Sequence, residues 1–168
     1  MITKLETGDL HLHKDDFDLI EMIENVFELL EMKAAKREIS IGLDKNYARP
    51  VLVHGDEERV QQVLTNLIVN SIKYGKPNGT TIVAVDSYNE GKFIIKVIDN
   101  GEGIKQQHLS RLFERFYRVD QSRSREQGGS GLGLSIVKHI IEAHNETILL
   151  KSTFGEGSEF SFTLEKAK

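Results

Sequence analysis

Three short motifs in this 168-residue chain carry residue types that suit a phosphate-containing ligand. Residues 66–74 hold two asparagines and a lysine, residues 99–104 set an aspartate beside two glycines, and residues 129–134 contain three alternating glycines. Each motif is weak alone. In this order they supply a helix bearing carboxamides, a carboxylate on a glycine turn and a glycine-rich helix start, which are the parts needed to hold a nucleotide with its metal.

The first motif belongs to a predicted helix over residues 56–74. Asp56 is a suitable N-cap, and Gly75 and Pro77 end the pattern. At about 100° per residue, one stripe of this helix is apolar and must face the core. Its members are Val60, Val63, Leu64, Leu67, Ile68 and Ser71.

A second face of the same helix is polar and carries Asn66, Asn70 and Lys73, with Arg59 nearer its start. These four positions lie within about 60° of one another around the helix axis. An asparagine oxygen is a hard ligand that suits Mg2+, and a lysine neutralises phosphate. The competing interpretation is an ordinary solvated face.

Asp99 ends an apolar run that predicts a strand, which places its carboxylate at the edge of a sheet. A carboxylate accepts hydrogen bonds without donating, so it suits an exocyclic amino group such as that of adenine. Gly101 and Gly103 permit unusual backbone angles and the close approach of a ligand. The alternative is a plain Asp-Asn-Gly turn.

The third motif opens a predicted helix over residues 130–144. Free amide groups at a helix start bind phosphate, and glycines let the phosphate come close. The motif is not a P-loop, because no Gly-Lys-Ser/Thr follows, and it lacks the preceding strand that a dinucleotide-binding fold needs. A flexible hinge is the alternative.

A long connection over residues 101–128 has no regular pattern except an apolar cluster at 109–117. Connections of this length are functional or disordered. The aromatics of residues 112–118 could anchor a mobile segment against the core while Arg115 and Arg118 reach phosphates. Equally, Phe113 and Phe116 could be core residues beside solvated arginines.

The remaining elements predict an α+β fold, a two-layer sandwich with helices on one face of a mixed, mostly antiparallel sheet. Asp18 is a candidate cap for a helix that runs through Leu30, with Glu21 as its reciprocal partner. The strand patterns cover residues 38–43, 51–53, 80–87, 92–98, 147–152 and 159–164. Residues 1–15 are irregular.

Composition excludes several classes of protein. There are no cysteines, so disulfides and thiolate metal sites are excluded. A net charge of −4 argues against a general nucleic-acid binder. The sequence has no apolar run of about 18 residues, so it predicts no membrane-spanning helix. Residues 105–126 hold six basic and three acidic side chains, a local balance of +3 that could face a polyanion or belong to a solvated loop.

The motifs resemble those of the ATP-binding catalytic domain of sensor histidine kinases, from about Phe17 to Leu164. Residues 66–74 are similar to the family's asparagine box, 99–104 and 129–134 to its two glycine boxes, and 112–118 to its phenylalanine box. The resemblance implies the Bergerat fold, with a long ATP lid over about residues 105–129. It also implies Mg-ATP as the ligand.

The resemblance implies a role for each box. Asn70 would bind magnesium, Asn66 would support the phosphate site, Lys73 would contact phosphate and Asp99 would bond the adenine amino group. The other residues implied to contact ATP are Tyr74, Gly101, Gly103, Ile104, Tyr117, Arg118, Gly129, Ser130, Gly131, Leu132, Gly133 and Leu134. Ser71, Gly75 and Ser130 depart from the residues most often found in these boxes, and none removes a polar group from the site.

One part of a complete kinase is missing from the sequence. The phosphoacceptor histidine of these enzymes precedes an acidic residue, and none of the six histidines here does so. We therefore expect a protein-histidine kinase fragment in which residues 1–15 are the remnant of a dimerisation helix and linker and 16–168 form the catalytic domain. It would donate the γ-phosphoryl group to a histidine of the absent dimerisation domain, for signalling through a response regulator.

The expected setting is the cytoplasmic side of a membrane-anchored bacterial sensor, with the fragment itself monomeric. Two other functions fit the same motifs. One is an ATP-gated interaction module that transfers no phosphate, and the other is a serine kinase of the anti-sigma type on the same fold. The aromatic segment and the resemblance of residues 5–19 to the family's interdomain join favour the histidine kinase.

Overall fold

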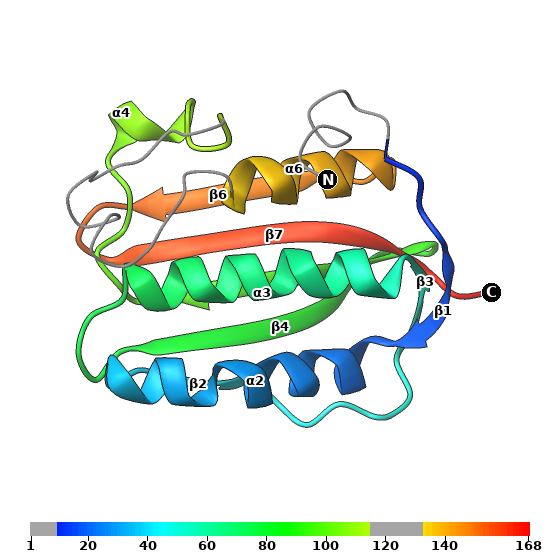
Figure 1. Cartoon of the computed structure of the whole chain (residues 1–168), viewed down its shortest axis with the longest axis horizontal. Coiled ribbons are helices and arrows are strands. Elements are labelled where there is room, and N and C mark those ends of the chain that lie inside the picture. The colour runs from blue at the N-terminus through cyan, green and yellow to red at the C-terminus, as the bar shows by residue number, and fades with distance from the viewer. Residues whose placement is uncertain (1–9, 115–132) are drawn as a thin grey trace.

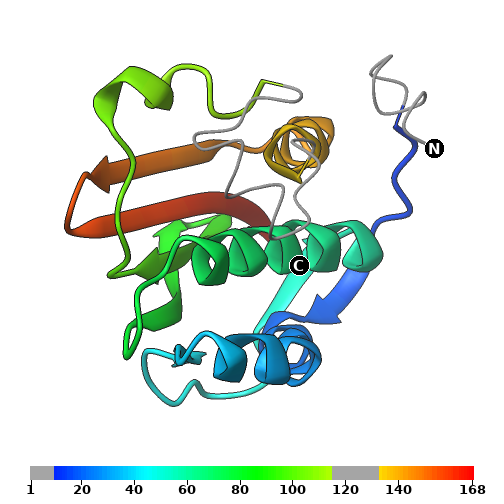
Figure 2. The same cartoon turned by 60° about the vertical axis from the view of Figure 1, so that its left-hand side comes forward.

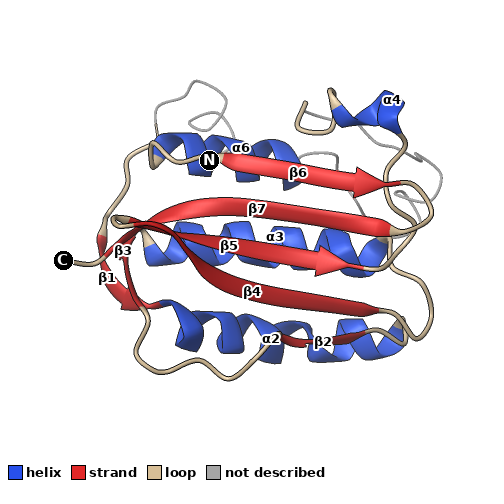
Figure 3. Ribbon diagram, turned by 180° about the vertical axis from the view of Figure 1, so that it is seen from behind, coloured by secondary structure: helices blue, strands red, loops and turns tan. Residues whose placement is uncertain are grey.

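A computed structural model describes residues 10–114 and 133–168 and shows two layers, a sheet and a layer of helices on one of its faces (Figure 1). Seen from behind, the other face of the sheet is not covered by any described helix (Figure 3). The predicted α+β sandwich is therefore confirmed.

All six predicted β patterns form strands, with small shifts in their ends, and β1 is an additional strand. They are β1 (Asp15–Asp18), β2 (Ser40–Leu43), β3 (Leu52–Gly55), β4 (Thr80–Asn89), β5 (Lys92–Asp99), β6 (Ile148–Thr153) and β7 (Gly157–Lys166). The helices are α2 (Leu19–Lys36), α3 (Glu57–Lys73), the short α4 (Gln106–Leu109) and α6 (Gly133–Ala143).

The seven strands form one sheet in the order β1-β3-β7-β5-β4-β2, and β6 also pairs with β7. Only β2 and β4 are parallel among these pairs; the others are antiparallel, so the predicted mixed sheet is confirmed. Two strands, β6 and β3, pair with the same edge of the long strand β7. Its first half pairs with β6, and its last two residues pair with β3.

The helices α2, α3 and α6 lie side by side against the sheet, with α3 in the middle (Figure 2). Both predicted caps are confirmed: Asp18 accepts a hydrogen bond from the Ile20 amide at 3.1 Å, and Asp56 accepts one from the Arg59 amide at 3.2 Å. Such caps satisfy amides that the helix leaves unpaired. They fix where α2 and α3 begin.

The core lies between the two layers. The predicted apolar stripe of α3 is buried, and Ile72 joins it. These side chains face Val83, Val97, Phe160 and Phe162 of the central strands, all of which are at most 1% exposed. Each fully buried side chain of this size contributes about 1.5–3 kcal/mol relative to exposure, so the core holds α3 rigidly over the sheet.

Two elements were not predicted. Residues 15–18 form β1 because they pair with β3, a partner almost forty residues away, and four residues are too few to show an alternating pattern. The connection after Gly101, expected to be irregular, contains α4. In the described ranges, no helix is both long and apolar enough to cross a membrane.

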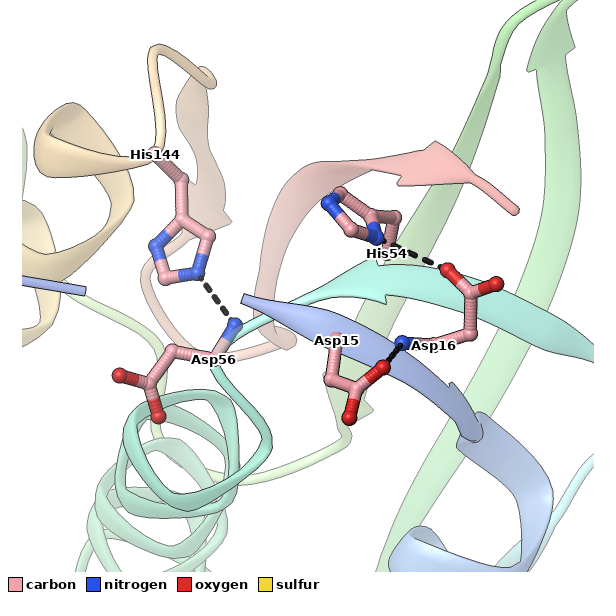
Figure 4. A network of polar contacts seen from close by, with 5 residues as sticks. All are labelled: Asp15, Asp16, His54, Asp56 and His144. Carbon is pink, nitrogen blue, oxygen red and sulfur yellow. Dashed lines mark hydrogen bonds and ion pairs between the residues drawn. The ribbon is translucent and has the colours of Figure 1, made fainter. Parts of the chain in front are cut away.

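A buried histidine joins the end of α6 to the start of α3 (Figure 4). His144 is 3% exposed, and its Nδ1 lies 2.9 Å from the Ile140 carbonyl oxygen. Its Nε2 therefore accepts a hydrogen bond from the Asp56 amide at 3.1 Å. The Asp56 carboxylate in turn accepts one from the His13 amide, so the segment before β1 meets the same joint.

The His144 joint makes stability depend on pH. Burial lowers the pKa of His144 below its ordinary value of 6.5, because the charged ring would lose its water, and this outweighs the hydrogen bond to the Ile140 carbonyl, which acts in the opposite direction. As the pH falls below about 6.5, the unfolded chain takes up the proton first, so the free energy of unfolding decreases. Urea unfolding at pH 7.5 and pH 5.5 should show this loss. His144→Gln should reduce it, whereas His11→Gln, at an exposed position, should leave it unchanged.

Candidate functional site

The polar end of the sheet is built around Asp99, the last residue of β5. Its Oδ1 accepts a hydrogen bond from the Gly101 amide at 2.9 Å, and its Oδ2 accepts one from the Ser71 hydroxyl at 3.1 Å. The Ser158 amide, opposite Asp99 in the ladder, is a further donor. The carboxylate is thus held in one orientation at the boundary between sheet and helices.

A small hydroxyl cluster supports this carboxylate. Ser71 Oγ lies 2.7 Å from Thr81 Oγ1, and Thr81 is the β4 residue that pairs with Asp99. Ser71 and Thr81 are 1% and 0% exposed, so their hydroxyls replace water around one side of the carboxylate. Buried polar groups of this kind need such partners.

Burial raises the pKa of Asp99, while its hydrogen bonds from Gly101, Ser71 and Ser158 act in the opposite direction. The pKa of Asp99 in the folded protein lies above the ordinary 3.8. As the pH rises above that value, the unfolded chain ionises more readily, so the free energy of unfolding decreases. Keeping this carboxyl group ionised at the end of the sheet therefore costs free energy. A ligand with an N–H group aimed at the carboxylate would recover part of it.

The glycine turn after Asp99 is packed too closely for side chains. A Cβ atom at Gly101 would lie 2.5 Å from the Tyr74 carbonyl oxygen, and one at Gly103 would lie 2.2 Å from the Thr153 carbonyl oxygen. Gly103 also has a φ of 73°, in the region that glycine favours. The turn is thereby wedged between the end of α3 and the β6–β7 hairpin.

The predicted polar face of α3 leads to this turn. Asn66, Asn70 and Lys73 are all half-buried, and the Lys73 ammonium lies 5.5 Å from the centre of the Tyr74 ring. The Tyr74 carbonyl accepts a hydrogen bond from the Glu102 amide at 3.2 Å. The end of the asparagine motif and the start of the first glycine motif therefore form one site.

The second glycine motif reaches the same helix at its described end. Asn66 Nδ2 donates a hydrogen bond to the Gly133 carbonyl at 3.3 Å, and Leu134 packs against the core. Gly133 has open space where a Cβ atom would lie. The other predicted contacts in this part of the chain, Tyr117, Arg118, Gly129, Ser130, Gly131 and Leu132, lie outside the described residues.

The aromatic segment is partly described. Leu112 is buried, and the Phe113 ring meets Phe160 of β7 edge to face with centroids 6.2 Å apart. Phe113 is thus attached to the core, as both interpretations required. Phe116, Arg115 and Arg118, which would decide about phosphate contact, lie outside the described residues.

The donor set fits a cation held with few protein ligands. No group of three histidine, cysteine, aspartate or glutamate side chains that could hold a metal exists in the described ranges. The Asn70 carboxamide makes no hydrogen bond to another described residue and remains available as a single hard oxygen ligand. That pattern suits Mg2+, which keeps waters and phosphate oxygens in its coordination shell, better than metals that need a protein cage.

Sequence reasoning missed the hydroxyls around Asp99. Ser71 was assigned to the apolar stripe of α3, and a serine at a core position was the signal that it had a polar partner. Thr81, Ser152 and Ser158 gave no such signal. They become neighbours of the site only through the register of β4, β5, β6 and β7.

Comparison with known proteins agrees with this architecture. The full-length histidine kinase ShkA, in complex with AMPPNP, superposes with a TM-score of 0.83 and 25% identity, covering 98% of this chain and 34% of that one. Residues 55–168 match the family model of histidine kinase-, DNA gyrase B- and HSP90-like ATPases. The fold is therefore that of an ATPase domain of this type.

The chain belongs to the family of histidine kinase-, DNA gyrase B- and HSP90-like ATPases. Among curated relatives, it is 37% identical to hybrid signal transduction histidine kinase B of Dictyostelium discoideum, covering 96% of this chain and 8% of that protein. It is 35% identical to the sensor protein SrrB of Staphylococcus aureus, covering 98% of this chain and 28% of that protein. The chain thus spans less than a third of either relative.

The tight turn gives a direct test of the site's packing. Gly103→Ala should lower the free energy of unfolding by roughly 1–3 kcal/mol, since the methyl group meets backbone and the φ is unfavourable for alanine. Gly42→Ala, where nothing lies within 4 Å of the new Cβ atom, is the matched control. Equal urea midpoints for the two variants would contradict the described geometry.

Proposed function

We propose that this domain binds Mg-ATP at the polar end of the sheet and donates the γ-phosphoryl group to a histidine on a dimerisation domain. The observation that carries the proposal is the half-buried Asp99 carboxylate, fixed by three hydrogen bonds beside the polar face of α3. A fixed acceptor next to carboxamides and a lysine matches a ligand with an amino-bearing base at one end and phosphates at the other.

Each described residue has a role in this proposal. Asp99 accepts a hydrogen bond from the adenine amino group, and Gly101, Gly103, Ile104 and Tyr74 shape the space around the base. Lys73 neutralises phosphate charge. Asn66 holds the Gly133 carbonyl, which keeps the start of α6 beside α3 and its phosphate-binding amides in place.

The phosphate end would also use Asn70 as the protein ligand of Mg2+. The ion supplies charge neutralisation to the transferring phosphoryl group when bound. The chain's own contribution is to orient the triphosphate between α3 and the start of α6, because in-line transfer depends on positioning. Tyr117, Arg118 and Gly129, in a lid over about residues 105–129, are proposed to complete the contacts together with Ser130, Gly131, Leu132 and Leu134 around the start of α6.

The acceptor must come from elsewhere, because no histidine in the sequence precedes an acidic residue. We propose that residues 1–15 lead from a dimerisation domain and that 16–168 are the catalytic domain, monomeric by itself. A response regulator would be the next acceptor. Support comes from the relatives, one of which is named a histidine kinase and another a sensor protein. A cytoplasmic position beneath a membrane-anchored bacterial sensor is proposed on the same basis.

The relatives do not favour the two alternatives, an ATP-gated module without transfer and an anti-sigma type serine kinase. Similar proteins are named for histidine kinase activity, and the polar face of α3 retains both asparagines and the lysine. A degenerate module would have no need of a metal ligand at Asn70. Transfer to an added dimerisation domain separates the three functions.

Asp99→Asn tests recognition of the base. The new amide presents N–H groups where the carboxylate accepted, so we expect ATP affinity to fall about 10- to 100-fold, the cost of an unpaired donor. Removing a buried charge should leave the unfolding free energy unchanged or higher. Isothermal calorimetry with ATP measures the affinity. Asp86→Asn, at an exposed position of the neighbouring strand β4, is the control; full affinity in Asp99→Asn would refute the assignment.

Asn70→Ala tests the metal assignment. ATP binding should lose most of its dependence on Mg2+, and phosphoryl transfer to a separately supplied dimerisation domain should fall about tenfold or more. Radiolabelled γ-phosphate on that domain provides the readout. Gln61→Ala, on the same helix away from the glycine turn, should keep both properties. If Asn70→Ala transfers phosphate at the normal rate, Asn70 is not the metal ligand.

A further inference from the structure

The hydroxyl of Ser152 connects β6 to two other segments at the end of the sheet that carries Asp99. It lies 2.8 Å from the Ile104 amide, 3.0 Å from the Gly157 carbonyl and 2.8 Å from the Ser158 hydroxyl. Its partners thus belong to the connection after the glycine turn and to the start of β7. None of the sequence motifs includes Ser152.

The valence of a hydroxyl fixes the direction of these three bonds. A serine has one proton to donate and two lone pairs. The Ile104 amide can only donate and the Gly157 carbonyl can only accept, so Ser152 donates to Gly157 and accepts from Ile104. Its remaining lone pair then accepts from the Ser158 hydroxyl. The Ser152 hydroxyl therefore uses its proton and both lone pairs in hydrogen bonds, and the Ser158 hydroxyl donates its proton to Ser152.

One side of this junction leads to Asp99. The Ser158 amide donates to the Asp99 carboxylate, and the two residues are opposite in the β5–β7 ladder. Gly157 also touches the Asp99 backbone closely, since a Cβ atom on it would lie 2.1 Å from the Asp99 carbonyl oxygen. A shift of the start of β7 therefore moves the Ser158 amide, one of the three donors to the carboxylate.

The other side leads to the segment 104–114. Ile104 is partly buried and comes just before α4, which lies near the end of β6 (Figure 1). The same segment is attached at its far end, where Leu112 is buried and Phe113 packs on Phe160. The Ser152–Ile104 hydrogen bond therefore fixes the beginning of a segment whose end is fixed by the core.

We propose that Ser152 is a positioning residue that couples the Asp99 end of the nucleotide pocket to the segment 104–114. The proposal rests on the proposed function, because binding of the base at Asp99 is the event that the coupling transmits. When the base is bound at Asp99, Ser158 and Gly157 are held in place. Ser152 then keeps its hydrogen bonds to both residues, and its hydroxyl remains the acceptor for the Ile104 amide. Without the Ser152 hydroxyl, binding at Asp99 no longer affects the Ile104 amide.

The β6–β7 hairpin contains a matched control. Thr163 Oγ1 also accepts a backbone amide across the pair, that of Thr147 at 3.1 Å, and donates to Glu146. It lies at the opposite end of the hairpin from Ser152. Thr163→Val removes a bridging hydroxyl of the same kind without touching the pocket, so it separates general hairpin stability from coupling.

The test is amide hydrogen exchange of Ile104 by NMR, with and without saturating adenosine, which carries the base and no phosphate. In the unsubstituted chain, adenosine should slow exchange at Ile104. In Ser152→Ala, exchange without ligand should be about 3- to 10-fold faster, the loss of one ordinary hydrogen bond, and adenosine should no longer slow it. Ser152→Thr should restore the response, and Thr163→Val should retain it.

The outcomes separate this proposal from the function on which it rests. If the unsubstituted chain binds no adenine ligand, the proposed function and the coupling both fail. If it binds and Ser152→Ala shows the same protection of Ile104 as the unsubstituted chain, only the coupling is overturned. Should Ser152→Ala fail to fold in a thermal scan, Ser152→Cys retains the size with a weak hydrogen-bonding group and is read in the same way.

Discussion

The rest of the site depends on one constraint: the oxygens of a half-buried carboxyl group need hydrogen-bond donors to replace the water that burial removes. Asp99 meets this constraint through donors from three different elements, the Ser71 hydroxyl of α3, the Gly101 amide and the Ser158 amide of β7. The three donors must all lie within hydrogen-bonding distance of Asp99. The last turn of α3, which carries Ser71, therefore has to lie over the end of β5. The glycines of the turn have a different cause, since side chains there would meet the Tyr74 and Thr153 carbonyl oxygens.

The helix α3 connects the two ends of the domain. Its apolar stripe fixes its rotation over the sheet, and rotation in turn decides where the asparagines point. Its start is held by Asp56, which also meets His144 and the His13 amide. Its end contacts the glycine turn through the Tyr74 carbonyl. A single rigid helix therefore carries core packing, the candidate metal ligand and the attachment to the turn.

Sequence reasoning predicted the parts of this arrangement that are encoded locally. The helix over residues 56–74, the strand that ends at Asp99 and the glycine turn have periodicity, caps and turn residues within a short window. The strand β1 and the supporting roles of Thr81 and Ser152 have no local signal, because they exist only through pairing with residues distant in the chain. The family resemblance named the motif residues, but a hydroxyl outside the motifs is visible only in three dimensions.

The position of β1 has a mechanical consequence. Among the strands that the structure describes, this four-residue strand is the outermost on its side and pairs with β3 alone, which meets β7 at Glu165 and Lys166. Asp99 and Ser158 lie at the other end of the β5–β7 ladder. Tension applied through the N-terminal segment would therefore peel a short edge ladder before it loads the eight paired positions between β5 and β7. The domain can therefore lose its N-terminal edge strand while the Asp99 end of the sheet stays intact.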